Sequence, residues 1–302
     1  MDGITEKIKE LKAEMNAVIL AHYYTSPEVQ KIADYVGDSF YLAKMAKASD
    51  ADTVVFAGVS FMGESAKLLC PDKRVLMPDL KADCAMAHMV DLDKIQALRA
   101  RYQDLAVVCY INSTAEVKRH SDVCVTSSNA VKIVKSLPNN NILFIPDGNL
   151  GAFVKEKVPE KNVILNDGYC PIHAAVSAEE ILKSKALHPQ AKVLTHPECK
   201  KEVLELSDFI GSTADIIKFA NESECTEFII VTEDGVLYPL VTKNPSKKFY
   251  PVREGFVCSD MKLNTVEKIL EVLQNGKNEV FVDSELAKSA MLPLERMLEI
   301  AK

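Results

Sequence analysis

The sequence of 302 residues contains no tryptophan, and aromatic residues make up only 7% of it. It has no block of clustered Lys and Arg, and its formal net charge is −7. Because nucleic acids are bound through clustered basic side chains, these features argue against a nucleic-acid partner. An anionic small molecule is still compatible with the sequence, since local dipoles, hydroxyl groups or a metal could hold it.

Long apolar runs are also absent, and none approaches the roughly 20 residues of a membrane-spanning helix. The N-terminal stretch does not place a basic region before an apolar one, as a secretory signal peptide would. We therefore expect a cytoplasmic protein with no membrane partner. With 48% hydrophobic residues, the chain can bury a core in one to three domains.

The eight cysteines include no Cys-x-x-Cys pair. A chain of this size in a reducing compartment needs no disulfides, so each cysteine taken alone is best interpreted as a small buried apolar residue. The segment DGYCPIH, residues 167–173, nevertheless places Cys170 in a Gly/Pro turn three residues before His173. Its interpretation depends on whether other parts of the chain supply partners for Cys170.

Amphipathic helical patterns alternate with short β-branched runs along the chain, which is typical of parallel sheets covered by helices on both faces. This pattern repeats three times. Matching segments, at steps of 88 and 86 residues, are ADYVGDS (33–39), SDVCVTS (121–127) and SDFIGST (207–213). Hydrophobic strands with the same steps are TVVFAG (53–58), NILFIP (141–146) and EFIIVT (227–232).

Each repeat also ends in a cysteine, and Cys84, Cys170 and Cys258 follow one another at steps of 86 and 88 residues. Three units of about 87 residues could form a row or a closed triangle. One cysteine per unit favours the triangle, with the thiolates meeting on its axis. We predict an α/β fold of three similar αβα sandwich units with short parallel sheets, in a pseudo-threefold arrangement around a central site. The predicted units are 1–90, 91–176 and 177–302, the last with an additional C-terminal helix.

The same register places polar residues at the carboxyl ends of strands or at helix starts, where parallel α/β sheets bind ligands. Any one of them could be a structural cap or a packing residue, but their threefold coincidence favours a ligand site. We expect the hydroxyl at each helix start to cap that helix, whose free N–H groups attract anions. The nine positions are His22, Tyr24, Ser39, Tyr110, Asn112, Ser127, His196, Glu198 and Thr213.

Three thiolates without a fourth protein ligand leave one coordination position open. Zinc with three cysteines and water is one option, although structural zinc usually uses closely spaced pairs. We favour a [4Fe–4S] cluster, because its ligands can be far apart in sequence and its free iron could act as a Lewis acid. His173 would lie beside it as a hydrogen-bond donor or a core residue. The remaining cysteines are expected to be structural: Cys70, Cys109, Cys124, Cys199 and Cys225.

Over nearly its whole length the chain resembles the quinolinate synthase family, the A protein of bacterial and archaeal NAD biosynthesis. The motifs are LAHYY, IADYVGDS, DCAMA, YINSTAEVK, TSSNA, PDGNLG, GYCPIH, HPEC, GST and CSDMKLNT. The resemblance implies three αβα units around a [4Fe–4S] cluster. It also implies an enzyme that condenses iminoaspartate with dihydroxyacetone phosphate, with loss of phosphate and two waters and closure of the quinolinate ring. An aspartate-oxidising enzyme would be the source of iminoaspartate.

The resemblance implies a role for each matching residue. Cys84, Cys170 and Cys258 would be the cluster ligands. Tyr24 and Glu198, with His196 as a third, would transfer protons, and a carboxylate beside a cluster and an anionic substrate should have a raised pKa. The substrate contacts would be His22, Ser39, Tyr110, Asn112, Ser127, His196, Glu198 and Thr213.

Two residues depart from the family pattern, namely Tyr23, where Asn is frequent, and Ala214, where Gly is frequent. Both residues flank the predicted site, and neither departure removes a group that performs chemistry. Two other hypotheses stay open: a different hydro-lyase with a substrate-bound cluster, and a non-catalytic binding or iron-sensing protein. The C-terminal segment 284–302 is expected to pack against the core instead of closing over the site.

Overall fold

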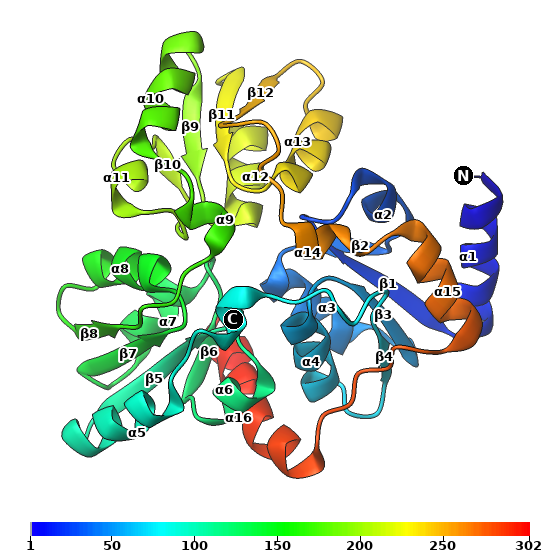
Figure 1. Cartoon of the computed structure of the whole chain (residues 1–302), viewed down its shortest axis with the longest axis horizontal. Helices are drawn as coiled ribbons and strands as arrows, with labels where there is room; N and C mark the ends of the chain where they lie inside the picture. Colours follow the sequence, from blue (N-terminus) through cyan, green and yellow to red (C-terminus); the bar gives the residue numbers. More distant parts are fainter. Residues whose placement is uncertain (1) are drawn as a thin grey trace.

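The computed structural model describes residues 2–302, which form three lobes around a common centre (Figure 1). Each lobe contains one four-stranded sheet in which all neighbouring strands are parallel. Helices connect consecutive strands and cover the sheets. The predicted fold class, an α/β protein of three similar αβα units, is therefore confirmed.

The strand order is the same in all three sheets: the first strand of each unit lies between the second and the third, and the fourth lies outermost. The first sheet contains β1 (Ala17–His22), β2 (Tyr35–Gly37), β3 (Thr53–Ala57) and β4 (Arg74–Leu76). The second contains β5 (Leu105–Tyr110), β6 (Val123–Val125), β7 (Asn141–Ile145) and β8 (Asn162–Leu165). The third contains β9 (Lys192–Thr195), β10 (Phe209–Ile210), β11 (Glu227–Val231) and β12 (Lys248–Pro251).

Most helices are short, with about three turns or fewer. Before and within the first unit they are α1 (Asp2–Glu14), α2 (Pro27–Ile32), α3 (Ser39–Ala48), α4 (Ser60–Leu69) and η1 (Ala85–His88). In the second they are α5 (Leu92–Arg101), α6 (Ala115–Arg119), α7 (Ala130–Ser136), α8 (Gly148–Lys157) and α9 (Pro171–Ala174). The rest are α10 (Ala178–Leu187), α11 (Lys201–Leu204), α12 (Thr213–Glu222), η2 (Asp234–Val236), α13 (Leu237–Lys243), α14 (Ser259–Lys262), α15 (Val266–Asn275) and α16 (Ser284–Ile300).

The strands are apolar on both faces because helices cover both faces of each sheet. In the first sheet, Leu20 and Phe56 pack into a core that includes α3 and α4. Their neighbours Ile19 and Val55 point to the opposite face and pack against α1, α2 and α15. Successive side chains of a strand alternate between faces, so two buried faces require a continuous apolar run.

The repeated aspartates of the sequence join the second strand of each unit to the first. The Asp34 side chain accepts the backbone N–H of Ile19 at 2.8 Å, and its own N–H donates to the Ile19 carbonyl at 2.9 Å. Asp122 with Val107 and Asp208 with Val193 repeat both hydrogen bonds. The aspartates also form ion pairs with Lys12, Arg99 and Lys192, respectively. These residues are therefore part of the scaffold and not of the site.

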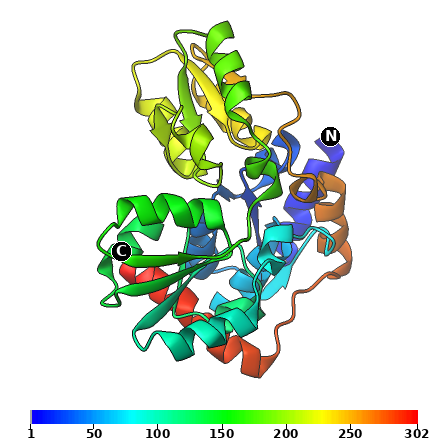
Figure 2. The same cartoon turned by 60° about the vertical axis from the view of Figure 1, so that its left-hand side comes forward.

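The last two helices return to the first two units. α15 packs against α1, and α16 packs against α4, α6 and β6. Figures 1 and 2 both show α16, in red, lying among the elements of the second unit. Because Leu294 and Met297 are fully buried in the core, the expected packing of the C-terminal segment is confirmed. For the units themselves we propose boundaries near residues 90 and 176.

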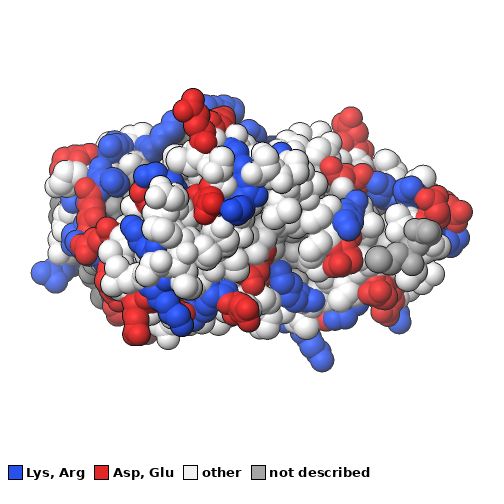
Figure 3. Space-filling view, turned by 90° about the horizontal axis from the view of Figure 1, so that it is seen from above, with Lys and Arg blue, Asp and Glu red and all other residues white. Residues whose placement is uncertain are grey.

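The outer surface carries charges of both signs. On the face shown in Figure 3, acidic and basic side chains are interspersed. Within residues 2–302, none of the helices is both long enough and apolar enough to cross a membrane.

Candidate active site and metal centre

A cavity of about 230 Å³ lies where the three units meet. It is lined by the residues that follow the carboxyl ends of the strands, as expected for parallel sheets. Among the described residues that line it, none is Lys or Arg. All twelve predicted site residues line this one cavity: His22, Tyr24, Ser39, Cys84, Tyr110, Asn112, Ser127, Cys170, His196, Glu198, Thr213 and Cys258.

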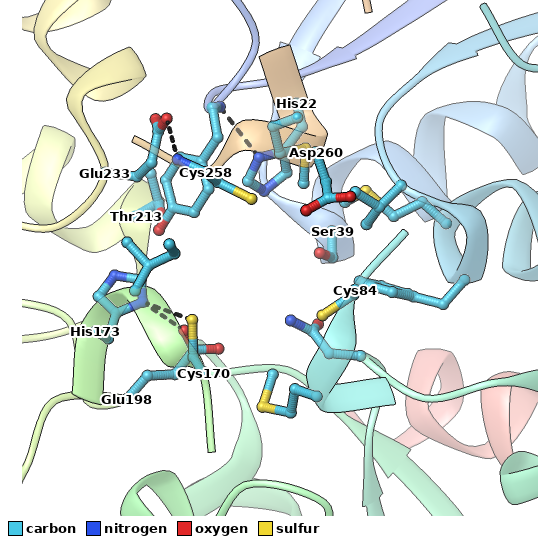
Figure 4. Close-up of a pocket in the computed structure, with 18 of the residues that line it drawn as sticks. His22, Ser39, Cys84, Cys170, His173, Glu198, Thr213, Glu233, Cys258 and Asp260 are labelled. Atoms are coloured by element: carbon cyan, nitrogen blue, oxygen red, sulfur yellow. Dashed lines mark hydrogen bonds and ion pairs between the residues drawn. The ribbon is translucent and has the colours of Figure 1, made fainter. Parts of the chain in front are cut away.

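The three cysteines occupy equivalent places in the three units. Cys84, Cys170 and Cys258 each follow the fourth strand and stand at the N-cap of a short helix, η1, α9 and α14, respectively. Figure 4 shows their sulfur atoms around the same open space. The other cysteines do not line the cavity within the described chain: four of them are buried, and Cys225 is half-buried.

The chemistry of these donors fits an iron–sulfur cluster. Burial raises the pKa of the Cys84 thiol to about 12 and also raises the pKa values of Cys170 and Cys258. A coordinated cation removes the proton of a thiol outright and so compensates for the cost of a buried thiolate. Three sulfur atoms from three units around one space match the thiolate ligation of such clusters.

Two buried carboxylates that were not predicted hold the turns of Cys170 and Cys258. The Cys170 N–H donates to Asp147 at 3.1 Å, and the Cys258 N–H donates to Glu233 at 3.1 Å. Glu233 also forms an ion pair with Lys262 at 2.8 Å. A signal was present in the sequence, since the two acids follow the third strands of their units and are 86 residues apart, one step of the repeat.

The predicted helix caps are wrong by one or more residues. Asp38 is the N-cap of α3 and Ser212 is the N-cap of α12, each accepting a backbone N–H with its side chain. Asn129 is the N-cap of α7. Because the preceding residue caps the helix, the hydroxyls of Ser39 and Thr213 are free to line the cavity.

His22 and His196 have the same local geometry at the ends of their strands. Nδ1 of His22 accepts the N–H of Tyr24 at 3.1 Å, and Nδ1 of His196 accepts the N–H of Glu198 at 3.4 Å. Mainly because of burial, the pKa is lowered to about 3 for His22 and about 4 for His196. Both rings are therefore neutral at pH 7 and carry their proton on Nε2. The His196 Nε2–H lies 3.3 Å from the Ser127 hydroxyl.

A chain of hydrogen bonds connects Glu198 with Tyr24. Glu198 lies 2.8 Å from Nδ1 of His173, and Nε2 of His173 lies 3.0 Å from the Thr232 hydroxyl. That hydroxyl lies 2.8 Å from the Tyr24 hydroxyl, which is also 3.0 Å from Thr213. His173 is thus a buried link between two predicted site residues, and Thr232 is a further link that was not predicted.

Beside a bound cluster and an anionic substrate the pKa of Glu198 is still expected to be raised, whereas in the chain alone its neighbours act in the opposite direction. Burial raises the pKa of this carboxyl, but positive charge on His196 or His173, together with hydrogen bonds from His173 and Tyr110, lowers it overall. The tyrosines behave in the opposite way, because burial, followed by the nearby Glu198 charge, raises the pKa of both Tyr24 and Tyr110 well above the ordinary value. At neutral pH the site therefore combines an ionised carboxylate with protonated phenols.

A fold of three αβα units around one cavity that contains thiols and acid–base groups places the chain among the α/β enzymes. The chain belongs to the quinolinate synthetase A protein family, whose sequence model matches residues 6–299.

Close relatives cover the whole chain. The quinolinate synthase of Fusobacterium nucleatum is 53% identical over 98% of this chain and 99% of its own length. The quinolinate synthase of Clostridioides difficile is 50% identical over 99% of this chain and 98% of its own length. That of Caldicellulosiruptor saccharolyticus is 48% identical over 100% of this chain and 99% of its own length.

Proposed function

We propose that this chain is a quinolinate synthase that condenses iminoaspartate with dihydroxyacetone phosphate and closes the ring, with loss of phosphate and two waters. The reaction would be a step of NAD biosynthesis, and iminoaspartate would come from an aspartate-oxidising enzyme. The observation that carries the proposal is the single cavity that combines three thiols, two histidine donors and the Glu198–Tyr24 hydrogen-bond chain.

Binding of the anionic substrates would depend on neutral donors, since no lysine or arginine is found among the described lining residues. The Nε2–H groups of His22 and His196 and the hydroxyls of Ser39 and Ser127 would donate to carboxylate or phosphate oxygens. α3 and α12 begin at the cavity and direct their N-terminal N–H groups and positive dipole ends toward it. Tyr110, Asn112 and Thr213 would complete the contacts.

Proton transfer would use the two ends of the hydrogen-bond chain. Tyr24 retains its proton at neutral pH, so its hydroxyl would act as the general acid toward an oxygen that leaves the substrate. The ionised Glu198 would accept a proton that the substrate loses, directly or through His173. Thr213 and Thr232 would orient the Tyr24 hydroxyl, and His196 would hold Glu198 in place by accepting its backbone N–H.

Cys84, Cys170 and Cys258 would hold a [4Fe–4S] cluster. When bound, the cluster supplies an iron without a protein ligand, which can act as a Lewis acid for hydroxyl groups that leave the substrate. Asp147 and Glu233 would keep the Cys170 and Cys258 turns in place by accepting their N–H groups.

The test is an anaerobic assay of the purified chain after iron and sulfide reconstitution. Dihydroxyacetone phosphate is supplied directly, and iminoaspartate is formed in the reaction by enzymatic oxidation of aspartate. We expect quinolinate to accumulate, as measured by chromatography, and expect none from Cys84→Ser. Cluster-replete protein that makes no quinolinate from these two compounds would overturn the proposed substrates.

A further inference from the structure

One corner of the cavity brings three different metal-ligating atoms together. The sulfur of Cys170, a ring nitrogen of His173 and a carboxylate oxygen of Glu198 all lie within 4.8 Å of one another. Nδ1 of His173 is 3.3 Å from the Cys170 sulfur and 2.8 Å from the Glu198 oxygen. In a tetrahedral zinc site, with bonds of about 2.0–2.3 Å, neighbouring ligand atoms lie about 3.3–3.6 Å apart. The nitrogen–sulfur distance already fits such a site, the nitrogen–oxygen distance would have to lengthen by about 0.5 Å, and the sulfur–oxygen pair lies within 4.8 Å.

The surroundings of these atoms also resemble a ligand set. His173 is 1% exposed and Glu198 is 3% exposed, so both side chains are held in place by the interior. Nε2 of His173 contacts the Thr232 hydroxyl at 3.0 Å, the kind of outer partner that orients a metal-bound imidazole. The backbone carbonyl of Glu198 is fixed by Asn149 at 3.1 Å.

We propose that the cluster-free chain binds one zinc-class divalent ion through Cys170, His173 and Glu198, with water as a fourth ligand. Binding displaces the proton of the Cys170 thiol to solvent. The proton that His173 holds on Nδ1 against Glu198 moves to Nε2, where the Thr232 hydroxyl accepts it, and Nδ1 is then free to bind the ion. Three protein ligands of mixed N, O and S type with one water are an ordinary zinc environment.

This ion site shares only one residue with the proposed cluster. Within residues 2–302, Cys84 and Cys258 belong to no such close group of three ligand atoms. A cluster and a single ion both require the Cys170 thiolate, so they exclude each other. The conclusion that cluster and ion exclude each other rests on the cluster ligands given under the proposed function. The ion site itself does not depend on them. A bound ion would also occupy Glu198 and His173, the groups proposed for proton transfer, and would therefore inhibit the enzyme.

The two ligand sets permit a crossed test on the full-length chain. Cluster-free protein, prepared anaerobically with a chelator, is titrated with Co²⁺ as the probe, since tetrahedral thiolate-bound cobalt has characteristic visible and charge-transfer absorption. We expect one Co²⁺ per chain, displaced by Zn²⁺. Cys84→Ser should bind Co²⁺ as the unaltered chain does, whereas Glu198→Gln should bind it at least ~10-fold more weakly.

Cluster assembly in the same variants should show the reverse pattern. With iron and sulfide, Glu198→Gln should assemble a cluster and Cys84→Ser should not, while Cys170→Ser should lose both the cluster and the cobalt site. Zinc added to the unaltered chain before iron and sulfide should slow assembly. Iron analysis and absorption spectra measure each result without an activity assay.

Two results would overturn the ion site: cobalt binding without thiolate charge transfer, or equal loss of cobalt affinity in Cys84→Ser and Glu198→Gln. Circular dichroism checks that each variant is folded, and His173→Gln serves in place of Glu198→Gln if the latter is not. Failure of quinolinate formation with an intact crossed pattern would reject the proposed substrates and leave the ion site standing.

Discussion

The strand starts and the strand ends of the three sheets follow different rules. Toward the start of each first strand, an aspartate that directly precedes the second strand makes the same two backbone hydrogen bonds in all three units. At the carboxyl ends, aligned positions carry different side chains, such as His22, Tyr110 and His196. The repeated contacts build the scaffold, and the departures from the repeat supply the different chemical groups of the site.

The first and third units retain more of the repeat at this end than the second. In both, a strand-end histidine accepts the N–H of the residue two positions later, which is Tyr24 in one unit and Glu198 in the other. The same local frame thus presents a phenol from one unit and a carboxylate from another. One backbone arrangement therefore carries two different chemical groups, because the side chain at this position differs between the two copies.

The largest expected effect comes from removing the Tyr24 hydroxyl, the proposed proton donor. Tyr24→Phe retains the ring but deletes the hydroxyl between Thr213 and Thr232. We expect turnover to fall by ~10²–10⁴-fold, the usual contribution of general acid catalysis. The free energy of unfolding should change by only about 1 kcal/mol. Quinolinate assays and urea unfolding measure the two quantities.

Tyr23→Phe is the matched control for this variant. Tyr23 is adjacent in sequence but does not line the cavity and packs in the core of the third unit. Its variant should retain nearly full turnover. A comparable loss of turnover in both variants would mean that the Tyr24 hydroxyl has no special role.

A smaller effect should follow from loss of the carboxylate under one cysteine turn. Asp147→Ala leaves the N–H groups of Cys170 and Leu150 without their acceptor. An unpaired buried donor costs about 1–3 kcal/mol, so we expect weaker folding and faster loss of iron during gel filtration. Asp147→Asn, which keeps an acceptor oxygen, should retain more iron than Asp147→Ala. Equal iron content in the two variants and the unaltered chain would contradict this role.

The sequence could predict the positions of the site because the repeat and the strand ends are properties of local pattern. Cys84, Cys170 and Cys258 were identified by register alone, and the structure brings them to one cavity. The cap positions were wrong because Asp38 and Ser212 are equally good capping residues one position earlier. Local pattern does not decide between neighbouring residues that can both cap a helix.

The individual hydrogen bonds between units were beyond what the sequence could predict. The Thr232 hydroxyl contacts His173, which is 59 positions away in the sequence, and Tyr24, which is 208 positions away. Such pairs depend on how whole units pack. The lowered pKa of Glu198 has the same origin in part, because His173 lies 25 positions away in the sequence and only the tertiary structure places it beside this carboxyl. The type of a residue and its position at a strand end do not by themselves determine the pKa of its side chain.

Substitution of an aspartate at a strand start should lower the stability of the fold without lowering turnover. Asp122→Ala removes the acceptor of the Val107 N–H and the partner of Arg99. We expect the free energy of unfolding to fall by about 1–3 kcal/mol, mainly from the unpaired N–H. Turnover per folded, cluster-replete molecule should be unchanged. A large drop in that turnover at full folding would show that the strand starts and strand ends are not independent.

The smallest expected effect is a pH dependence of stability that comes from Asp208, the repeated aspartate of the third unit. Burial raises the pKa of Asp208, but the Val193 N–H and Lys192 outweigh burial, so the pKa of this carboxyl is lower in the folded chain than in the unfolded one. Its contribution to stability is therefore complete above the ordinary pKa of about 3.9 and is lost as the pH falls through the lower, folded value.

Asp208→Asn keeps the shape of the side chain and an acceptor oxygen but cannot ionise. Between pH 5 and pH 3, values taken as roughly bracketing an ordinary aspartate pKa, the free energy of unfolding of cluster-free Asp208→Asn should decline less steeply than that of the unaltered chain. Lys192→Met should reduce the steepness by a smaller amount, because the Val193 N–H and Lys185 still lower the pKa. Parallel urea-unfolding curves across this range for all three proteins would show that the ionised Asp208 contributes no net stability.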